Sequence, residues 1–150
     1  MTPPITAPST TILVVDDERF ARQVFYRMLS EEGYRVFEAG VAEEAIAVLE
    51  QAHRYVSLVL LDVVMPVVDG VQLGRRILGR WPALRLLYMS AYPAEVLAQH
   101  GLDNPAVPFL SKPFTRDELL AKIERALAPA TPSWVPGRTP ATQPAERPLT

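Results

Sequence analysis

Apolar residues along the chain fall into two alternating patterns. Short continuous apolar runs predict strands covered on both faces of a parallel sheet, and stretches with an apolar residue every three or four positions predict helices. The runs that predict buried strands are 12–15, 56–62, 84–90 and 107–110, and the short, partly alternating stretch 35–39 predicts a strand nearer the edge of the sheet. Because strands and helices alternate, we expect an α/β fold with a doubly wound, five-stranded parallel sheet built from right-handed crossovers.

Five helical segments connect or follow these strands. The first is predicted over 19–31, with Gly33 as its C-terminal cap and apolar positions at Phe20, Val24, Met28 and Leu29. Apolar stripes predict two more over 45–52 and 71–78, and a short, weak helix is predicted over 94–99. The last helix begins with a capping box, in which the side chains of Thr115 and Glu118 bind each other's free backbone amides.

The two ends of the chain differ from the part between them. Residues 1–10 hold three of the fifteen prolines together with Thr and Ser, which predicts a disordered leader. Residues 129–150 are rich in proline and carry no aliphatic stripe, which predicts a disordered tail. We therefore expect one folded domain, over residues 11–128.

Composition narrows the classes of function. The net charge of −2 and the lack of any long run of Lys or Arg argue against binding to nucleic acid. The absence of cysteine excludes disulfides, thiolate metal sites and thiol nucleophiles. The N-terminal residues lack the layout of a signal peptide and no apolar run is long enough to span a membrane, so we expect a soluble, cytoplasmic protein without membrane contact.

Residues with reactive side chains stand where four of the predicted strands end. They are Asp16, Asp17, Asp62, Ser90 and Lys112. The carboxyl ends of parallel strands meet at one edge of a sheet, so we expect these side chains to lie in a single crevice. Crowded carboxylates repel each other unless a cation is present, and an all-oxygen site favours Mg²⁺, with Mn²⁺ as a second candidate.

The same group of residues suits phosphoryl transfer to a carboxylate. Aspartate is a competent nucleophile when a metal ion and an ammonium group offset the charge of the incoming group. Lys112 would supply that ammonium group, and the hydroxyl of Ser90 would donate a hydrogen bond to a phosphoryl oxygen. Asp62, the lone acid at the end of a strongly apolar strand, would be the acceptor.

Four segments together resemble the receiver domain of bacterial two-component response regulators. They are Val14–Glu18, Leu61–Gly70, Tyr88–Ala91 and Leu110–Phe114. Each segment alone is a weak signal, but all four occur in the family's order and spacing, and the resemblance covers about residues 11–128. It implies a flavodoxin-like sheet with the strand order 2-1-3-4-5. It also implies a regulatory phosphoacceptor rather than an enzyme acting on other substrates.

The resemblance assigns a role to each residue of the crevice. Asp62 looks like the phosphoacceptor, and Lys112 like the residue that pairs with the phosphoryl group. Asp17 is similar to the family's direct Mg²⁺ ligand, while Asp16 would act mostly through water. The backbone carbonyl of Val64 would complete the protein's share of the metal shell.

Three further positions match the family's switch. Ser90 takes the place of the hydroxyl that moves to the phosphoryl group, and Phe109 that of the aromatic residue that turns inward in response. Pro113 matches the family's cis-proline. The implied output surface consists of the fourth helix, the fifth strand and the fifth helix.

Two positions beside the crevice depart from the polar residues that the family often has there. Val64 lies two residues after Asp62, and Tyr92 two residues after Ser90. A bulky apolar pair should hinder the water that attacks the phosphorylated aspartate. We therefore predict a phosphoryl lifetime longer than that of fast chemotaxis receivers.

Several functions stay open within this interpretation. The leading hypothesis is a single-domain response regulator that takes its phosphoryl group from a histidine kinase or phosphotransfer protein, acts on an unknown downstream protein and dimerises on phosphorylation. The strand before Ser90 also resembles receivers fused to hybrid histidine kinases, which favours a phosphorelay intermediate or phosphate sink. A Mg²⁺-dependent aspartyl-phosphate hydrolase and a degenerate receiver that only binds a partner are the remaining alternatives.

Overall fold

The computed structural model describes residues 10–92, residue 98 and residues 107–128. The strands are β1 (Thr11–Val15), β2 (Arg35–Ala39), β3 (Val56–Asp62), β4 (Arg85–Ser90) and β5 (Phe109–Ser111). The helices are α1 (Arg19–Glu31), α2 (Ala42–Ala52), α3 (Gly70–Arg80) and α5 (Arg116–Leu127). The predicted leader, the predicted tail and, apart from one residue, the predicted helix over 94–99 lie outside the described residues.

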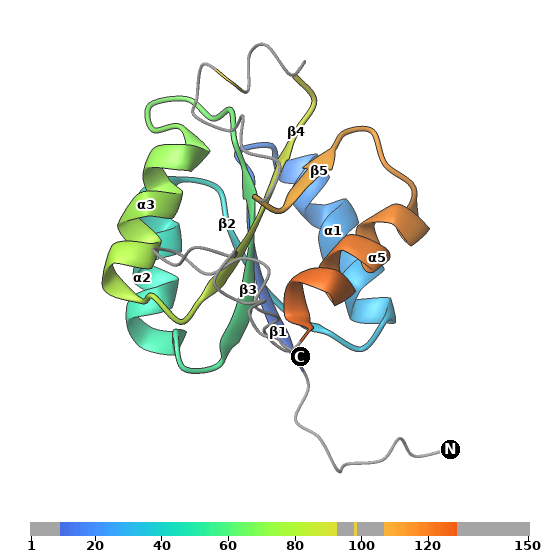
Figure 1. Ribbon diagram of the computed structural model, residues 1–150, viewed down its shortest axis with the longest axis horizontal. Helices are drawn as coiled ribbons and strands as arrows, with labels where there is room; N and C mark the ends of the chain where they lie inside the picture. Colours follow the sequence, from blue (N-terminus) through green and yellow to red (C-terminus); the bar gives the residue numbers. More distant parts are fainter. Residues whose placement is uncertain (1–9, 93–97, 99–106, 129–150) are drawn as a thin grey trace, which may run out of the picture.

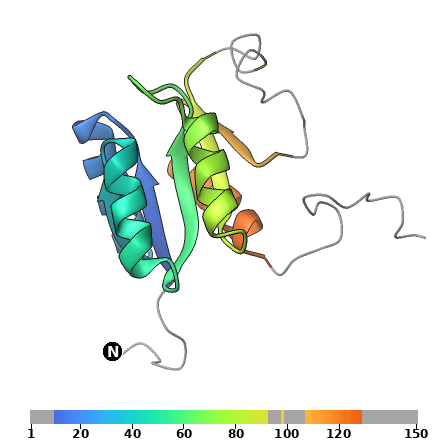
Figure 2. The same ribbon diagram turned by 90° about the vertical axis from the view of Figure 1, so that its left-hand side faces the viewer.

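The five strands form one parallel sheet in the order β2-β1-β3-β4-β5. Figure 1 shows α2 and α3 on one side of this sheet and α1 and α5 on the other, and Figure 2 shows α2 and α3 side by side in front of it. The predicted fold class and strand order are confirmed. The partial burial of β2 agrees with its place at an edge of the sheet.

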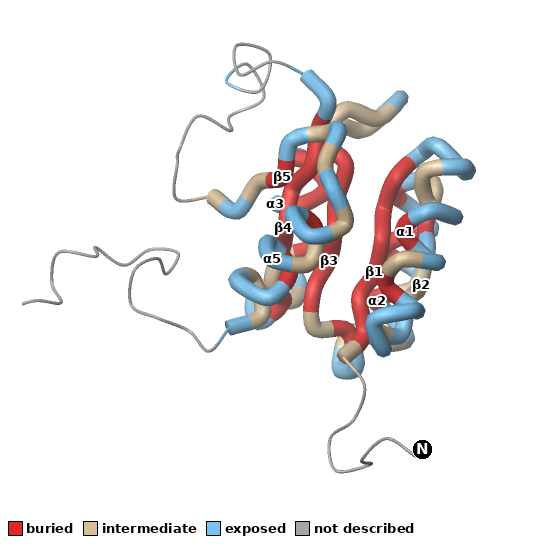
Figure 3. Tube along the Cα trace, turned by 90° about the vertical axis from the view of Figure 1, so that its right-hand side faces the viewer, coloured by how far each residue is buried: buried red, intermediate tan, exposed pale blue. Residues whose placement is uncertain are grey.

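Alternation along the central strands separates the core into two halves. In β1, Leu13 and Val15 belong to the cluster under α2 and α3, while Ile12 and Val14 belong to the cluster under α1 and α5. Successive side chains of a strand point to opposite faces, so a strand covered on both sides must be apolar at every position. All five residues of β1 are buried, and Figure 3 shows the central strands buried along their length.

Two details of the predicted elements are wrong. The fifth strand begins at Phe109 rather than at residue 107, because it pairs with the last residues of β4 alone. In α1 the buried residues are Phe25 and Leu29, while 71% of Phe20 is exposed. The spacing located the helix, but the sheet and α5 decide which face is covered.

Both ends of α5 are fixed by side-chain hydrogen bonds. The capping box of α5 is confirmed, with the Thr115 side chain accepting from Glu118 N and the Glu118 side chain accepting from the Thr115 amide. At the other end of α5, the Arg85 guanidinium donates to the carbonyl oxygens of Ala126 and Ala128. A cation is favourable there because helix carbonyls lack partners in the last turn.

None of the described helices combines the length and the apolar character needed to cross a bilayer.

Candidate functional site

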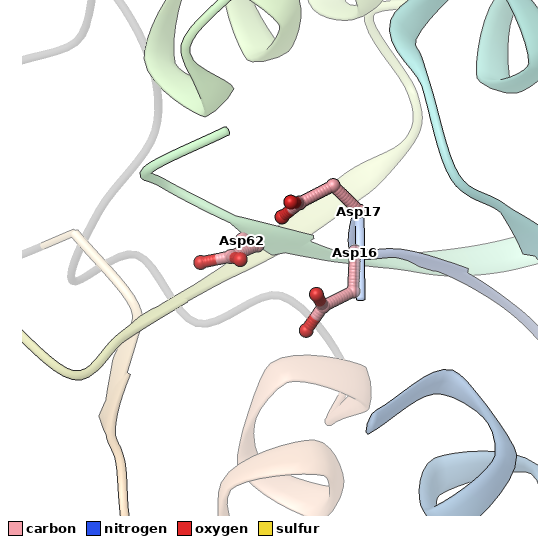
Figure 4. Close-up of side chains that lie close together, drawn as sticks. All are labelled: Asp16, Asp17 and Asp62. Atoms are coloured by element: carbon pink, nitrogen blue, oxygen red, sulfur yellow. The ribbon is translucent and has the colours of Figure 1, made fainter. Parts of the chain in front are cut away.

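The carboxyl ends of the strands carry the residues that the sequence singled out. Asp16 and Asp17 directly follow β1, Asp62 is the last residue of β3, and Ser90 is the last residue of β4. Lys112 follows β5. Figure 4 shows the carboxylate groups of Asp16, Asp17 and Asp62 on the same side of the strand ends, and one oxygen of each lies within 4.8 Å of the others.

Asp16 is buried, and every polar group that it carries is engaged. Its Oδ2 accepts a hydrogen bond from Lys112 Nζ at 3.0 Å, and its Oδ1 accepts one from the backbone amide of Glu18 at 2.9 Å. Its own amide donates to the carbonyl of Ala39 in β2, and its carbonyl accepts from Arg22. Asp16 therefore fixes the end of β1 and has little freedom left.

Asp17 has the opposite character. Its side chain is exposed, and among the described residues it takes part in no hydrogen bond or ion pair. A carboxylate that faces solvent beside two other acids is free to bind a cation. This contrast fits the roles that the resemblance implies, in which Asp17 binds the metal directly and Asp16 acts through water.

Asp62 is nearly buried, and its side chain is 10% exposed. The pKa of its carboxyl group is raised to about 7, mainly by burial and in smaller part by the charges of Asp16 and Asp17. Lys112, whose Nζ lies 3.8 Å from Asp62 Oδ2, lowers the pKa, as does a backbone hydrogen bond from Val64. One ammonium group is therefore not enough to balance three acids.

The residues present fit a hard divalent cation. Three carboxylates close together offer only oxygen ligands, and among the described residues Lys112 is the cation that forms ion pairs with two of them. Mg²⁺ takes carboxylate and carbonyl oxygens, keeps several waters and shares its shell with phosphoryl oxygens.

Ser90 is buried at the end of β4, one residue after Met89, which pairs with Asp62 of β3. Its Oγ accepts a hydrogen bond from the Tyr92 amide at 3.0 Å, and its carbonyl accepts from the Lys112 amide at 2.8 Å. The second bond holds the end of β4 to the lysine that follows β5. Because the Ser90 oxygen is the acceptor in this bond, its hydroxyl proton takes part in no hydrogen bond among residues 10–92 and 107–128.

The other predicted site residues surround this group. Phe109 is half-buried at the start of β5, directly across from Tyr88 of β4. The Lys112–Pro113 peptide bond is cis, the isomer that the resemblance implies at this position. Val64 is half-buried and packs against the core under α2 and α3, and Tyr92 is 49% exposed.

Sequence reasoning missed Arg22. This arginine reaches from the first turns of α1 to the carbonyl of Asp16, with its Nη1 2.6 Å from that oxygen. The signal in the sequence is a cation six residues after the first acid, but α1 also carries Arg19 and Arg27, and nothing in the spacing selects one of them.

The sequence model of the response regulator receiver domain matches residues 12–124. The chain belongs to this family. The receiver domain is 33% identical over 119 residues to the sensor kinase CckA of Brucella abortus, an alignment that covers 79% of this chain and 13% of that protein. It is 37% identical to the response regulator MprA of Mycolicibacterium vanbaalenii over 81% of this chain and 52% of that protein.

A solved structure similar to this receiver domain is the CheX–CheY–BeF₃–Mg²⁺ complex from Borrelia burgdorferi. It has a TM-score of 0.71 and 26% identity, and the match covers 80% of this chain and 90% of that one. The chain thus spans about half the length of MprA and a small part of CckA. Its membership makes it a phosphoacceptor module of two-component signalling, and the family is regulatory.

Proposed function

We propose that this receiver domain accepts a phosphoryl group on Asp62, with Mg²⁺ bound by Asp17 and Asp62 directly, by Asp16 through water and by the carbonyl of Val64. The observation that carries the proposal is the crowding of three carboxylates around Lys112 with too little positive charge to balance them. The similar CheX–CheY complex from Borrelia burgdorferi, which contains BeF₃ and Mg²⁺, adds support. Mn²⁺ has the same ligand preference and would substitute.

The transfer needs little from the protein besides position and charge. An Asp62 oxygen attacks the phosphorus of a phosphohistidine, the P–N bond breaks as the P–O bond forms, and the imidazole leaves with the electron pair. Lys112 lies close enough to Asp62 to pair with a phosphoryl oxygen once the bond forms. A bound Mg²⁺ would neutralise the charge gathered on the phosphoryl oxygens.

A small phosphodonor tests the acceptor. The full chain, incubated with Mg²⁺ and acetyl phosphate or phosphoramidate, should gain one phosphoryl group by intact mass. Asp62→Asn should gain none, and Asp117→Asn, which alters an exposed acid in the first turn of α5, should behave as wild type. A mass gain on Asp62→Asn, or none on wild type, would contradict the proposal. Rapid turnover of diverse phosphate esters would point instead to a hydrolase.

We also propose that Val64 and Tyr92 prolong the life of the phosphoryl group. Val64 lies two residues after Asp62 and Tyr92 two residues after Ser90, and neither side chain carries a charged group that could orient an attacking water. The phosphoprotein should lose its label more slowly than Val64→Asn or Tyr92→Glu, measured as decay of the phosphorylated mass in Mg²⁺. Loss within seconds that neither substitution changes would refute this part.

The output that we propose is a change of the surface formed by the fourth helix, β5 and α5. Ser90 would leave the Tyr92 amide and bind a phosphoryl oxygen, and Phe109 would then turn inward beside Tyr88. Ser90→Ala should still be phosphorylated but should fail to show phosphorylation-dependent capture of the partner protein. Light scattering of the phosphorylated chain shows whether that partner is a second copy.

We further propose a single-domain regulator in the cytoplasm that receives its phosphoryl group from a histidine kinase or phosphotransfer protein. An immunoblot of fractionated cells measures both the length of the polypeptide and its cellular location. A membrane-bound band, or a polypeptide much longer than this chain, would favour a receiver within a larger sensor protein, as in CckA.

A further inference from the structure

Arg22 ties the metal-binding loop to the neighbouring strand. Its guanidinium donates to the carbonyl of Asp16 at 2.6 Å, and its Nε lies 3.4 Å from Glu38 Oε1 in β2. The side chain is 17% exposed, so the group is largely removed from water. A half-buried cation in this place needs its hydrogen bonds, because an unpaired one would be costly.

The carbonyl that Arg22 holds belongs to the peptide linking Asp16 to Asp17. That peptide is planar, so fixing its oxygen fixes the orientation of the Asp17 amide and Cα as well. The Asp17 side chain has no hydrogen bond or ion pair among the described residues, so its direction depends on the backbone on either side of it. Arg22 holds the peptide before Asp17, and the Glu18 amide, which donates to Asp16 Oδ1, holds the peptide after it. Arg22 is therefore the side chain from another element that helps to set the direction of the Asp17 carboxylate.

Glu38 removes the electrostatic cost of this arrangement. A lone guanidinium beside the acidic cluster would repel a divalent cation, but Glu38 lies close enough to offset that charge. Gly40 leaves the space that the guanidinium fills, since a Cβ at that position would lie 2.8 Å from Arg22 Nη1. The pair and the glycine together hold the arginine head against the end of β1.

We propose that Arg22 is a positioning residue for the cation: through the Asp16 carbonyl it orients the Asp17 carboxylate for metal binding. The inference rests on the proposed Mg²⁺ site. It treats Arg22 as an outer partner of a ligand, the class of residue whose loss weakens metal binding about 10- to 100-fold. The expected loss of Mg²⁺ affinity is opposite to the effect of charge alone, because removing a nearby cation would by itself tighten Mg²⁺ binding.

Calorimetric titration of the full chain with MgCl₂ measures whether loss of Arg22 weakens or tightens Mg²⁺ binding. Arg22→Met should bind Mg²⁺ about tenfold more weakly than wild type. Arg27→Met, a matched change at an exposed arginine on the same helix, should bind as wild type does. Unchanged or tighter binding by Arg22→Met would overturn the inference. If wild type itself binds no Mg²⁺, the proposed function fails first.

Gly40→Ala reaches the same contact without changing the arginine. The three atoms nearest to the added methyl group all belong to the guanidinium, the end of a flexible side chain, so the substitution should push Arg22 off the Asp16 carbonyl and leave the fold intact. We expect weaker Mg²⁺ binding, similar to that of Arg22→Met, and no further loss in the double variant. Additive losses in the double variant would show that Gly40 acts by another route and would overturn the proposed coupling.

A readout without metal separates positioning from general stability. Hydrogen exchange followed by mass spectrometry should show faster exchange in the peptide covering residues 15–19 of Arg22→Met and Gly40→Ala, with exchange in β3 unchanged. Faster exchange across the whole sheet together with unchanged Mg²⁺ affinity would mean a purely structural role and would count against the inference.

Discussion

Two loops border the acidic cluster, and they are held in different ways. The loop after β1, residues 16–18, is fixed by groups from other elements: Arg22 of α1, Lys112 after β5 and the carbonyl of Ala39 in β2. The loop after β3, residues 63–69, is fixed mainly by its own backbone. In it the Val68 amide donates to the Pro66 carbonyl, and the Gly70 amide donates to the carbonyl of Val63.

The two loops also differ in backbone strain. The first loop is held by side-chain hydrogen bonds from distant residues and leaves Asp17 exposed. The second holds Val67 at a φ of 71°, in a γ-turn closed by the Val68 amide, with its side chain fully exposed. A β-branched residue rarely adopts this left-handed conformation, so the second loop stores strain beside the phosphoacceptor.

The largest effect is expected at Gly70, where the second loop meets α3. A Cβ there would overlap the carbonyl of Asp62 and crowd the Cα of Val63, both backbone atoms of a buried strand end. Gly70→Ala should lower the free energy of unfolding by about 3 kcal/mol or more, measured by urea denaturation.

Gly79→Ala is the matched control in the same helix. No atom lies within 4 Å of a Cβ at that position, so alanine should stabilise the chain by about 0.5–1 kcal/mol through its better helix propensity. Equal effects of the two substitutions would show that Gly70 is not packed against β3 as described.

The next effect concerns the charge of Asp62 and its dependence on pH. The pKa of this carboxyl group is about 7 in the folded protein against an ordinary 3.8, so between these values the folded chain holds a proton that the unfolded chain has released. The stability of the metal-free protein should therefore fall as the pH rises through this window. Asp62→Asn, which cannot ionise, should escape the fall and be more stable at pH 8 by about 1–2 kcal/mol, since Lys112 and solvent at the rim offset part of the charge.

Thermal unfolding of both proteins from pH 4 to pH 8 in EDTA measures this difference. Added Mg²⁺ should raise the melting temperature of wild type at pH 8 more than that of Asp62→Asn, because the cation binds the folded carboxylate. A constant gap between the two proteins over the whole range would contradict the raised pKa.

The smallest effect is expected at Val67. Glycine has no Cβ penalty in the left-handed region, so Val67→Gly should relieve strain and stabilise the protein by about 1 kcal/mol, partly offset by the greater freedom of glycine in the unfolded chain. Urea unfolding with Val67→Ala as the reference reads the effect, because alanine removes the β-branch and keeps the Cβ. If Val67→Gly is no more stable than Val67→Ala, the turn is not strained.

Much of the fold followed from local patterns. Apolar runs located the central strands because a strand buried on both faces must be mostly apolar, as β1 and β3 are, and partial alternation located the edge strand β2. The capping box at Thr115 was also predictable, because its hydrogen bonds join residues only three positions apart. The resemblance to receiver domains gave the roles of Asp62 and Lys112, and neither periodicity nor composition would have done so.

The sequence by itself thus determined where the elements lie and which chemical groups end the strands, because those features depend on neighbours a few residues away. The tertiary structure alone decided that α1 buries Phe25 rather than Phe20, and that Arg22 rather than Arg27 reaches the end of β1. It also decided the charge balance around Asp62, in which Lys112 contacts an acid 96 positions earlier in the chain. Such contacts depend on how the elements pack, and the spacing of residues along one helix or strand does not encode that packing.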